Sequence, residues 1–115
     1  MLEIDKDNNI KLTRGDTAYI NLDPLINSDG TVYEFQEGDK IYFRLRTNTY
    51  RLLTKELEID LSTNTATLSI DPLDTANFPL GVHKYELELV TVLNEHFTFI
   101  ANKKFILDRE LEGHG

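Results

Sequence analysis

The chain has 115 residues, a formal net charge of −8 and no cysteine. Its length is that of one domain, and we expect residues 1–115 to form a single unit with loosely ordered ends, 1–8 and 109–115. The lack of cysteine excludes disulfide scaffolds, thiolate metal sites and cysteine nucleophiles. The acidic composition argues against nucleic acid or a membrane as a partner, because phosphate groups would repel it.

The first half of the chain alternates apolar and polar residues with the period of β-strands. The pattern predicts an extended lead-in over 2–13, a strand over 17–23, a small edge strand over 32–35 and a strong strand over 40–47. Gly, Asn, Asp and Pro separate these segments, as is typical of turns.

The second half continues with the same period. A strand is predicted over 52–61, although its propensities would also suit a helix, and another over 65–70. A long strand over 81–93 then returns through a tight hairpin as a strand over 97–107, with a bulge expected around Asn102 and Lys103. These segments predict a two-sheet sandwich. Its predicted core consists of Ile20, Leu22, Ile41, Phe43, Leu45, Leu68, Ile70, Tyr85, Leu87, Leu89, Phe105 and Leu107.

One helical turn is predicted just before the long strand. Asp71 can cap it, Pro72 suits its first position, and Asp74 can complete a capping box. A proline and a glycine that follow would end the helix. We predict that the Tyr85 hydroxyl donates a hydrogen bond to the backbone of this corner, within residues 71–77.

Two short motifs have both a functional and a structural interpretation. Residues 14–16, Arg-Gly-Asp, match the tripeptide that integrins bind, but a glycine is also needed there to turn the chain. The acidic stretch from Asp5 to Asp16 has part of the ligand spacing of a calcium loop, without its glycine and its final glutamate. We therefore predict two turns and no metal site.

No combination of residues indicates catalysis. The three histidines have no second ligand at metal-binding spacing within their own segments, and no strained serine turn occurs. We expect no enzyme, no catalytic residue and no cofactor. A carbohydrate-binding or adhesion-type sandwich is the alternative to a protein-binding module, because outward aromatic rings can stack on sugars. The candidate rings are Tyr19, Tyr33, Tyr42 and Tyr50.

Three segments together resemble a known group of proteins. They are LTRGDTAYINL (12–22), EGDKIYFRLR (37–46) and IDPLDTANFPLGVHKYELEL (70–89). In order and spacing they resemble small immunoglobulin-like structural proteins of tailed phages and prophages, of the baseplate or tail type. The resemblance implies an antiparallel immunoglobulin-like β-sandwich of seven to eight strands with one short helical turn. His83 departs from it, since a tyrosine is usual at that position.

The resemblance also implies a function. Such a protein is a virion component that catalyses nothing and binds other virion or structural proteins, or itself. It would be found in the virion, or in the host cytoplasm before assembly, because the sequence shows no secretion signal or membrane segment.

We predict a contact surface on two neighbouring strands. If the strong strand lies antiparallel beside the long strand, its arginines share the outer face with the glutamates of the long strand. This band either fixes the strand register or docks a neighbouring subunit, where Arg and Tyr are favoured. The predicted charged face is Tyr42, Arg44, Arg46, Glu86 and Glu88.

Overall fold

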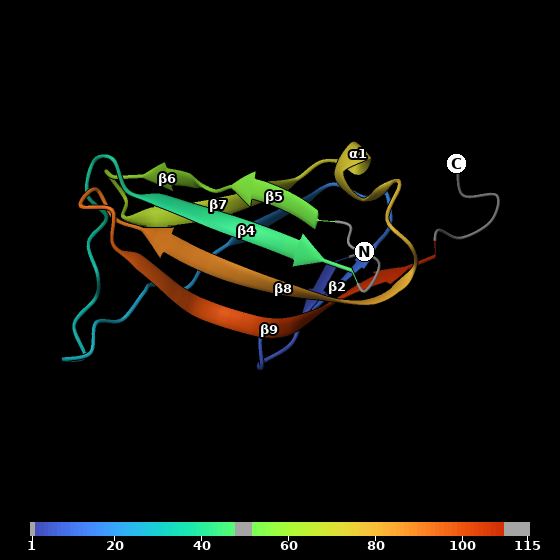
Figure 1. Cartoon of the computed structure of the whole chain (residues 1–115), viewed down its shortest axis with the longest axis horizontal. Helices are drawn as coiled ribbons and strands as arrows, with labels where there is room; N and C mark the ends of the chain where they lie inside the picture. The colour runs from blue at the N-terminus through green and yellow to red at the C-terminus, as the bar shows by residue number, and fades with distance from the viewer. Residues whose placement is uncertain (1, 48–51, 110–115) are drawn as a thin grey trace.

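The computed structural model describes residues 2–47 and 52–109, which form two β-sheets packed face to face and one short helix (Figure 1). None of the described residues belongs to a helix that is long and apolar enough to cross a membrane. The strands are β1 (Leu2–Ile4), β2 (Ile10–Thr13), β3 (Ala18–Asn21), β4 (Lys40–Arg46), β5 (Leu52–Glu56), β6 (Glu58–Asp60), β7 (Thr65–Ile70), β8 (Gly81–Val90) and β9 (His96–Asp108), and the helix is α1 (Pro72–Thr75).

The larger sheet has six strands in the order β1-β2-β9-β8-β4-β5, and the smaller has three in the order β3-β7-β6. The prediction of a two-sheet all-β fold is confirmed. The prediction of purely antiparallel pairing is wrong, because β2 runs parallel to the end of β9. This parallel pair arises because the chain lies along β9 in β2 and then crosses to the smaller sheet, where β3 pairs with β7.

The core is formed by the inward faces of both sheets, as the alternating pattern predicts. Phe43 lies at its centre, with its ring centroid 5.6 Å from that of Tyr85 and 5.8 Å from that of Phe105. Every predicted core residue is buried except Leu22, which is half-buried because β3 ends one residue earlier. The structure buries six further apolar residues outside that core set, which are Ile10, Leu12, Ala18, Leu57, Ala66 and Phe78.

Three segments differ from their predicted form. Residues 32–35 form no strand, and only an isolated bridge joins Ile26 to Val32. The strand predicted over 52–61 is two strands in different sheets, because the buried Leu57 turns the chain between them and donates its N–H to the Ile41 carbonyl (2.8 Å). Residues 2–8, expected to be loosely ordered, contain β1, whose apolar residues pair with β2. Residues 110–115 lie outside the described residues.

The bulge predicted in the last strand is present. Tyr85 pairs with Lys103 and Leu87 with Ile100, so β9 holds an extra residue between these pairs. Asn102 has a φ of +55°, a left-handed conformation that Asn tolerates better than most residues. The bulge allows β9 to follow β8 over its full length while it bends.

The corner before β8 forms as predicted, but Tyr85 does not bond to it. The backbone N–H of Asp71 donates to the Asp74 carboxylate (2.8 Å) at the start of α1. The Tyr85 hydroxyl donates instead to the carbonyl of Asn8. His83 is nearer the corner, and its Nε2 lies 2.7 Å from the Pro79 carbonyl oxygen. Tyr85 is two residues further along β8, where its ring reaches the turn between β1 and β2.

Replacing Tyr85 by Phe should lower the free energy of unfolding by about 0.5–1.5 kcal/mol, the net value of one hydrogen bond. The Asn8 carbonyl would lose its donor while the ring kept its packing. Urea denaturation measures the change. Tyr42→Phe, on the outer face of the sheet, is the control and should change stability by less than about 0.5 kcal/mol. Equal effects of the two substitutions would contradict the assignment.

Candidate functional site

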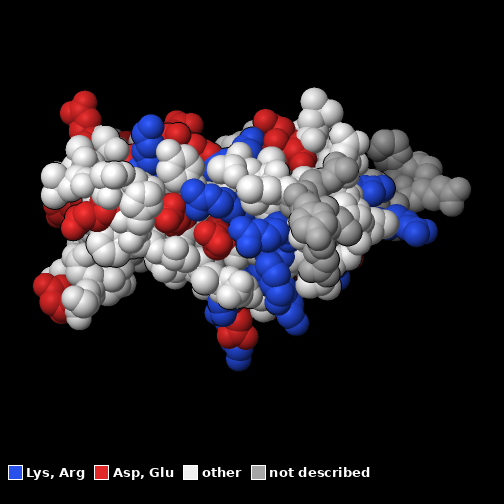
Figure 2. Space-filling model, in the orientation of Figure 1, with Lys and Arg blue, Asp and Glu red and all other residues white. Residues whose placement is uncertain are grey.

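The structure brings most of the predicted charged face together. β4 lies antiparallel beside β8, with Arg44 directly opposite Glu86. Its Nη1 lies 3.1 Å from Glu88 Oε1 and 3.5 Å from Glu86 Oε2. The guanidinium carbon is 5.4 Å from the ring centroid of Tyr42. Figure 2 shows Lys and Arg next to Asp and Glu on the face over β4 and β8.

In the ranges that the structure describes, Arg46 lacks a partner glutamate on this face, and His96, which was not predicted to belong to it, contacts Glu88. Arg46 lies opposite Lys84, and no ion pair joins it to either glutamate among the described residues. His96, on β9, lies with its Nδ1 3.3 Å from Glu88 Oε2. Burial raises the pKa of Glu88, but hydrogen bonds from Arg44 and His96 outweigh it and bring the pKa below its usual value. The charges thus largely satisfy one another, which favours a role in strand register.

The Arg-Gly-Asp segment is a structural turn held against α1. The Arg14 Nη1 donates to the carbonyl of Phe78 (3.2 Å), and the Gly15 N–H donates to the Oγ1 of Thr75 (2.9 Å). Gly15 has a φ of +86°, which a side chain would strain. Thr75 is fully buried. The tripeptide therefore joins β2 and β3 to the corner, and its arginine is part of that contact.

The acidic start of the predicted calcium loop is also a turn. Asp5 Oδ1 accepts hydrogen bonds from the backbone N–H groups of Asp7 and Asn9, both at 2.9 Å. These bonds, first that of Asn9, lower the pKa of the Asp5 carboxyl. Within residues 2–47 and 52–109, no three His, Cys, Asp or Glu side chains gather as a metal would require.

The three candidate sugar-stacking tyrosines within the described residues do not share a face. Tyr19 is 69% exposed on β3 of the smaller sheet, whereas Tyr42 is on the outer face of the larger sheet. Tyr33, expected to point outward, is half-buried, and its hydroxyl donates to the Asp39 carboxylate. Tyr50 and His114 lie outside the described residues. Tyr19, Tyr33 and Tyr42 therefore form no common aromatic platform.

A different surface, which sequence reasoning missed, lies where segment 22–39 meets the β8–β9 hairpin, at the left of Figure 1. Large apolar side chains are exposed there, and they flank a hollow of about 690 Å³. Its floor includes Leu25 and Leu89. We call the exposed group the loop-end patch: Ile26 (62% exposed), Val92 (57%), Leu93 (78%) and Phe97 (52%).

The carboxylate of Asp39 joins the two segments that carry this patch. Asp39 is only 8% exposed. Its Oδ2 accepts hydrogen bonds from the Tyr33 hydroxyl (2.6 Å) and the Gln36 N–H (2.8 Å). Its Oδ1 accepts a hydrogen bond from the Val92 N–H (2.9 Å), on the hairpin. One side chain therefore fixes segment 22–39 against the hairpin.

Two further contacts hold segment 22–39. Gly38 has a φ of +97°, and an added Cβ would lie 3.0 Å from a methyl carbon of Val92, so the two segments approach closely. Asn64, in the turn after β6, accepts a hydrogen bond from the Phe35 N–H (2.8 Å) and donates one to the Tyr33 carbonyl (3.1 Å). Segment 22–39, which carries part of the patch, is thus held by contacts with the hairpin on one side and with the turn after β6 on the other.

The loop end is acidic around its apolar patch. Segment 22–39 contains no Lys or Arg, and the hairpin adds Glu95. Figure 2 shows Asp and Glu side chains at this end of the molecule. The acids of the segment are Asp23, Asp29, Glu34, Glu37 and Asp39. A ligand for this surface would combine apolar groups with positive charge.

Sequence reasoning missed the patch because it extended the long strand to residue 93 and gave the other segment only turns and a small edge strand over 32–35. Ile26, Val32, Val92 and Leu93 are large apolar residues outside the regular strands of the structure, and this was the available signal. Scans against family models and curated proteins found no match. The resemblance to phage proteins therefore stays a prediction from its motifs.

Replacing Asp39 by Ala should destabilise the protein by about 2–3 kcal/mol, because the partly buried donors of Tyr33, Gln36 and Val92 would lose their buried, charged acceptor. Urea denaturation gives the change in free energy. Glu37→Ala, an exposed acid in the same segment, is the matched control, expected to change stability by less than about 0.5 kcal/mol. An Asp39→Ala protein as stable as the control would show that the carboxylate does not fasten the segments.

Stability should also fall at high pH. Burial and the bond to Asp39 raise the pKa of Tyr33 to about 12, and burial, with the charge of Asp5, raises that of Tyr85 to about 12. An unfolded tyrosine has a pKa of about 10, so these groups stabilise the fold fully below about pH 10 and lose that contribution as the pH rises towards about 12. Between about pH 10 and pH 12, the free energy of unfolding should fall less steeply with pH for Tyr33→Phe than for the wild type. Equal slopes would contradict the assignment.

Proposed function

We propose that this chain is a non-enzymatic structural module of a phage or prophage particle, of the baseplate or tail type, that binds another particle protein through its loop-end patch. The observation that carries the proposal is the patch itself. Ile26 and Leu93 are largely exposed on a surface that Asp39 and Asn64 hold in place. Contiguous apolar surface of this kind marks protein contacts.

The strand order supports an immunoglobulin-like sandwich. β4, β8 and β9 are neighbours with β5 at the edge, and β3, β7 and β6 form the opposing sheet. This matches the C, F and G strands with an added C′ strand, packed on B, E and D. In that correspondence, segment 22–39 and the hairpin are the B–C and F–G loops, which bind antigen in antibody variable domains. This analogy concerns the position of the patch on the fold.

The negative charge of the loop end indicates the surface chemistry of the partner. A protein surface that presents apolar side chains surrounded by Lys or Arg would complement the patch and its acidic surroundings. The preformed shape matters because an ordered surface loses little conformational entropy on binding. The charged face is a weaker candidate, because Arg44 already has partners in Glu86 and Glu88.

The proposal is tested in particles purified from cells that carry the gene. The wild-type chain should be found in the particles by mass spectrometry. Leu93→Asp should reduce its incorporation at least about tenfold, because a buried unpaired charge is costly at an interface. Leu73→Asp is the matched control, since Leu73 is 85% exposed on α1, far along the sandwich. Absence of the wild-type chain from the particles, or normal incorporation of Leu93→Asp, would refute the proposal.

A further inference from the structure

The sandwich is open along one side, between β3 and the first part of β9. β2 pairs with β9 only over Phe105–Asp108. Just before this stretch, the Lys104 N–H donates to the Asn9 side chain (3.0 Å). Within the described part of the chain, no strand lies on the outer edge of β9 from His96 to Asn102. β3 is likewise an edge strand of the smaller sheet.

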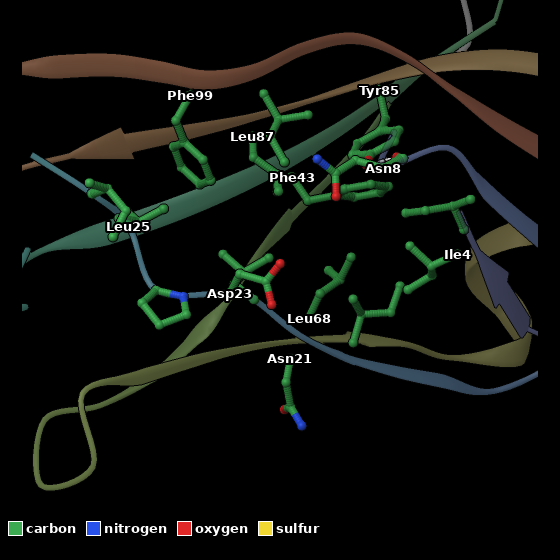
Figure 3. Close-up of a pocket in the computed structure, with 16 residues that line it drawn as sticks. Ile4, Asn8, Asn21, Asp23, Leu25, Phe43, Leu68, Tyr85, Leu87 and Phe99 are labelled. Carbon is green, nitrogen blue, oxygen red and sulfur yellow. Dashed lines mark hydrogen bonds between the residues drawn. The ribbon is translucent and has the colours of Figure 1, made fainter. Parts of the chain in front are cut away.

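Between these two edges lies an apolar cleft of about 460 Å³ (Figure 3). Ile20 and Leu68 line it from the smaller sheet, and Leu87, Phe99 and Ile100 from the larger. Phe99 and Ile100 are only half-buried. The cleft exists because β3 is short and the chain then leaves the smaller sheet, so nothing from that sheet covers this part of β9.

The open edge of β9 lacks the residues that normally block strand addition, although a second register shift occurs within it at Phe99, between the Leu87–Ile100 and Glu88–Thr98 pairs. Residues 96–102 read His-Phe-Thr-Phe-Ile-Ala-Asn, without Asp, Glu, Lys, Arg or Pro. Proteins usually protect edges with such residues, because unpaired backbone N–H and C=O groups accept a further strand. Aromatic and β-branched residues here also favour the extended conformation. The bulge at Asn102 marks the end of the available edge.

Asp23 gives the cleft a preference for positive charge. It follows β3 and lines the cleft, and Figure 3 shows it across from Leu87 and Phe99. No hydrogen bond or ion pair joins it to any described residue. Asp23 is exposed where it lines the cleft, so a cation brought by a ligand would pair with it at the surface, beside the apolar walls.

We propose that this cleft accepts an extended segment of another protein, which adds to β9 as a strand along residues 96–102. Its alternate side chains fill the cleft, and one of them is a Lys or Arg that pairs with Asp23. Backbone pairing supplies affinity, and the alternate side chains supply specificity, as in other strand additions. A second copy of this chain fits less well, because its own uncharged edge brings no cation to Asp23.

This proposal is independent of binding at the loop-end patch, although the two sites adjoin. Leu25, Ile26 and Phe99 line both the cleft and the hollow beside the patch. A single partner that occupies both would therefore make a continuous contact along β9. Because Leu93 lines the hollow and is absent from the cleft, a change at Leu93 separates the two sites.

The probes are fluorescent peptides of about nine residues, long enough to span this edge. They alternate Thr and Val and carry either Lys or Glu at one central Val position. Fluorescence anisotropy should show the Lys peptide binding at least about threefold more tightly than the Glu peptide, because Lys attracts and Glu repels the exposed Asp23 carboxylate. Binding of the Lys peptide should slow hydrogen exchange of those amides in 97–101 that do not pair with β8.

Three variants complete the test. Asp23→Asn should remove the preference for the Lys peptide, and Phe99→Glu should abolish binding of it by placing a charge in the cleft. Leu93→Asp should bind the Lys peptide as the wild type does. Equal affinity of the wild type for both peptides, unchanged exchange on β9, or loss of binding in Leu93→Asp would overturn the proposal. The proposal would also be overturned if the wild type sedimented as a dimer and Phe99→Glu as a monomer, since the occupant of the cleft would then be a second copy of the chain.

Discussion

The buried carboxylate of Asp39 is the contact on which the functional end of this protein depends. Segment 22–39 has almost no regular structure, so its backbone groups need partners other than a β-ladder. Asp39 accepts three hydrogen bonds at once, from the Tyr33 hydroxyl and from the backbone N–H groups of Gln36 and Val92. Because the last of them crosses to the β8–β9 hairpin, the same carboxylate sets the distance between two segments that are far apart in sequence. The apolar residues of the patch then lie on a surface of fixed shape.

The sandwich beneath has a different source of order. Phe43, Tyr85 and Phe105 form an aromatic centre in the larger sheet, and burial of such residues is the main stabilising contribution in a chain without disulfides. On the outer face, Arg44 bonds to Glu86 and Glu88 across the β4–β8 pair. The core packing and the charged pairs therefore both favour the same register of β4 against β8. The open cleft beside β3 is the place where this packing is incomplete, and there the inner face of β9 stays partly uncovered.

Alternation of apolar and polar residues was enough to find the main strands and nearly all of the core, because each strand has one buried face. The alternation could not show which hydrogen-bond partners the polar groups have. Tyr85 was correctly placed inward, but the partner of its hydroxyl lies in the turn between β1 and β2, far away in sequence and without a local signal. The division at Leu57 likewise depends on a change of sheet. The loop-end patch was missed for the same reason: whether Ile26 or Leu93 is exposed is decided by the folding of segment 22–39 against the hairpin, not by its composition.

The central claim is that Asp39 fastens segment 22–39 to the hairpin before any partner binds. Hydrogen exchange of the Val92 amide in the free protein tests it most directly, because this N–H donates to the Asp39 carboxylate rather than to a strand partner. If the claim holds, the amide exchanges at least about a hundredfold more slowly than in an unstructured peptide, as a closed native contact does. Exchange at the unstructured rate would show that the loop end opens freely and that the patch has no fixed shape.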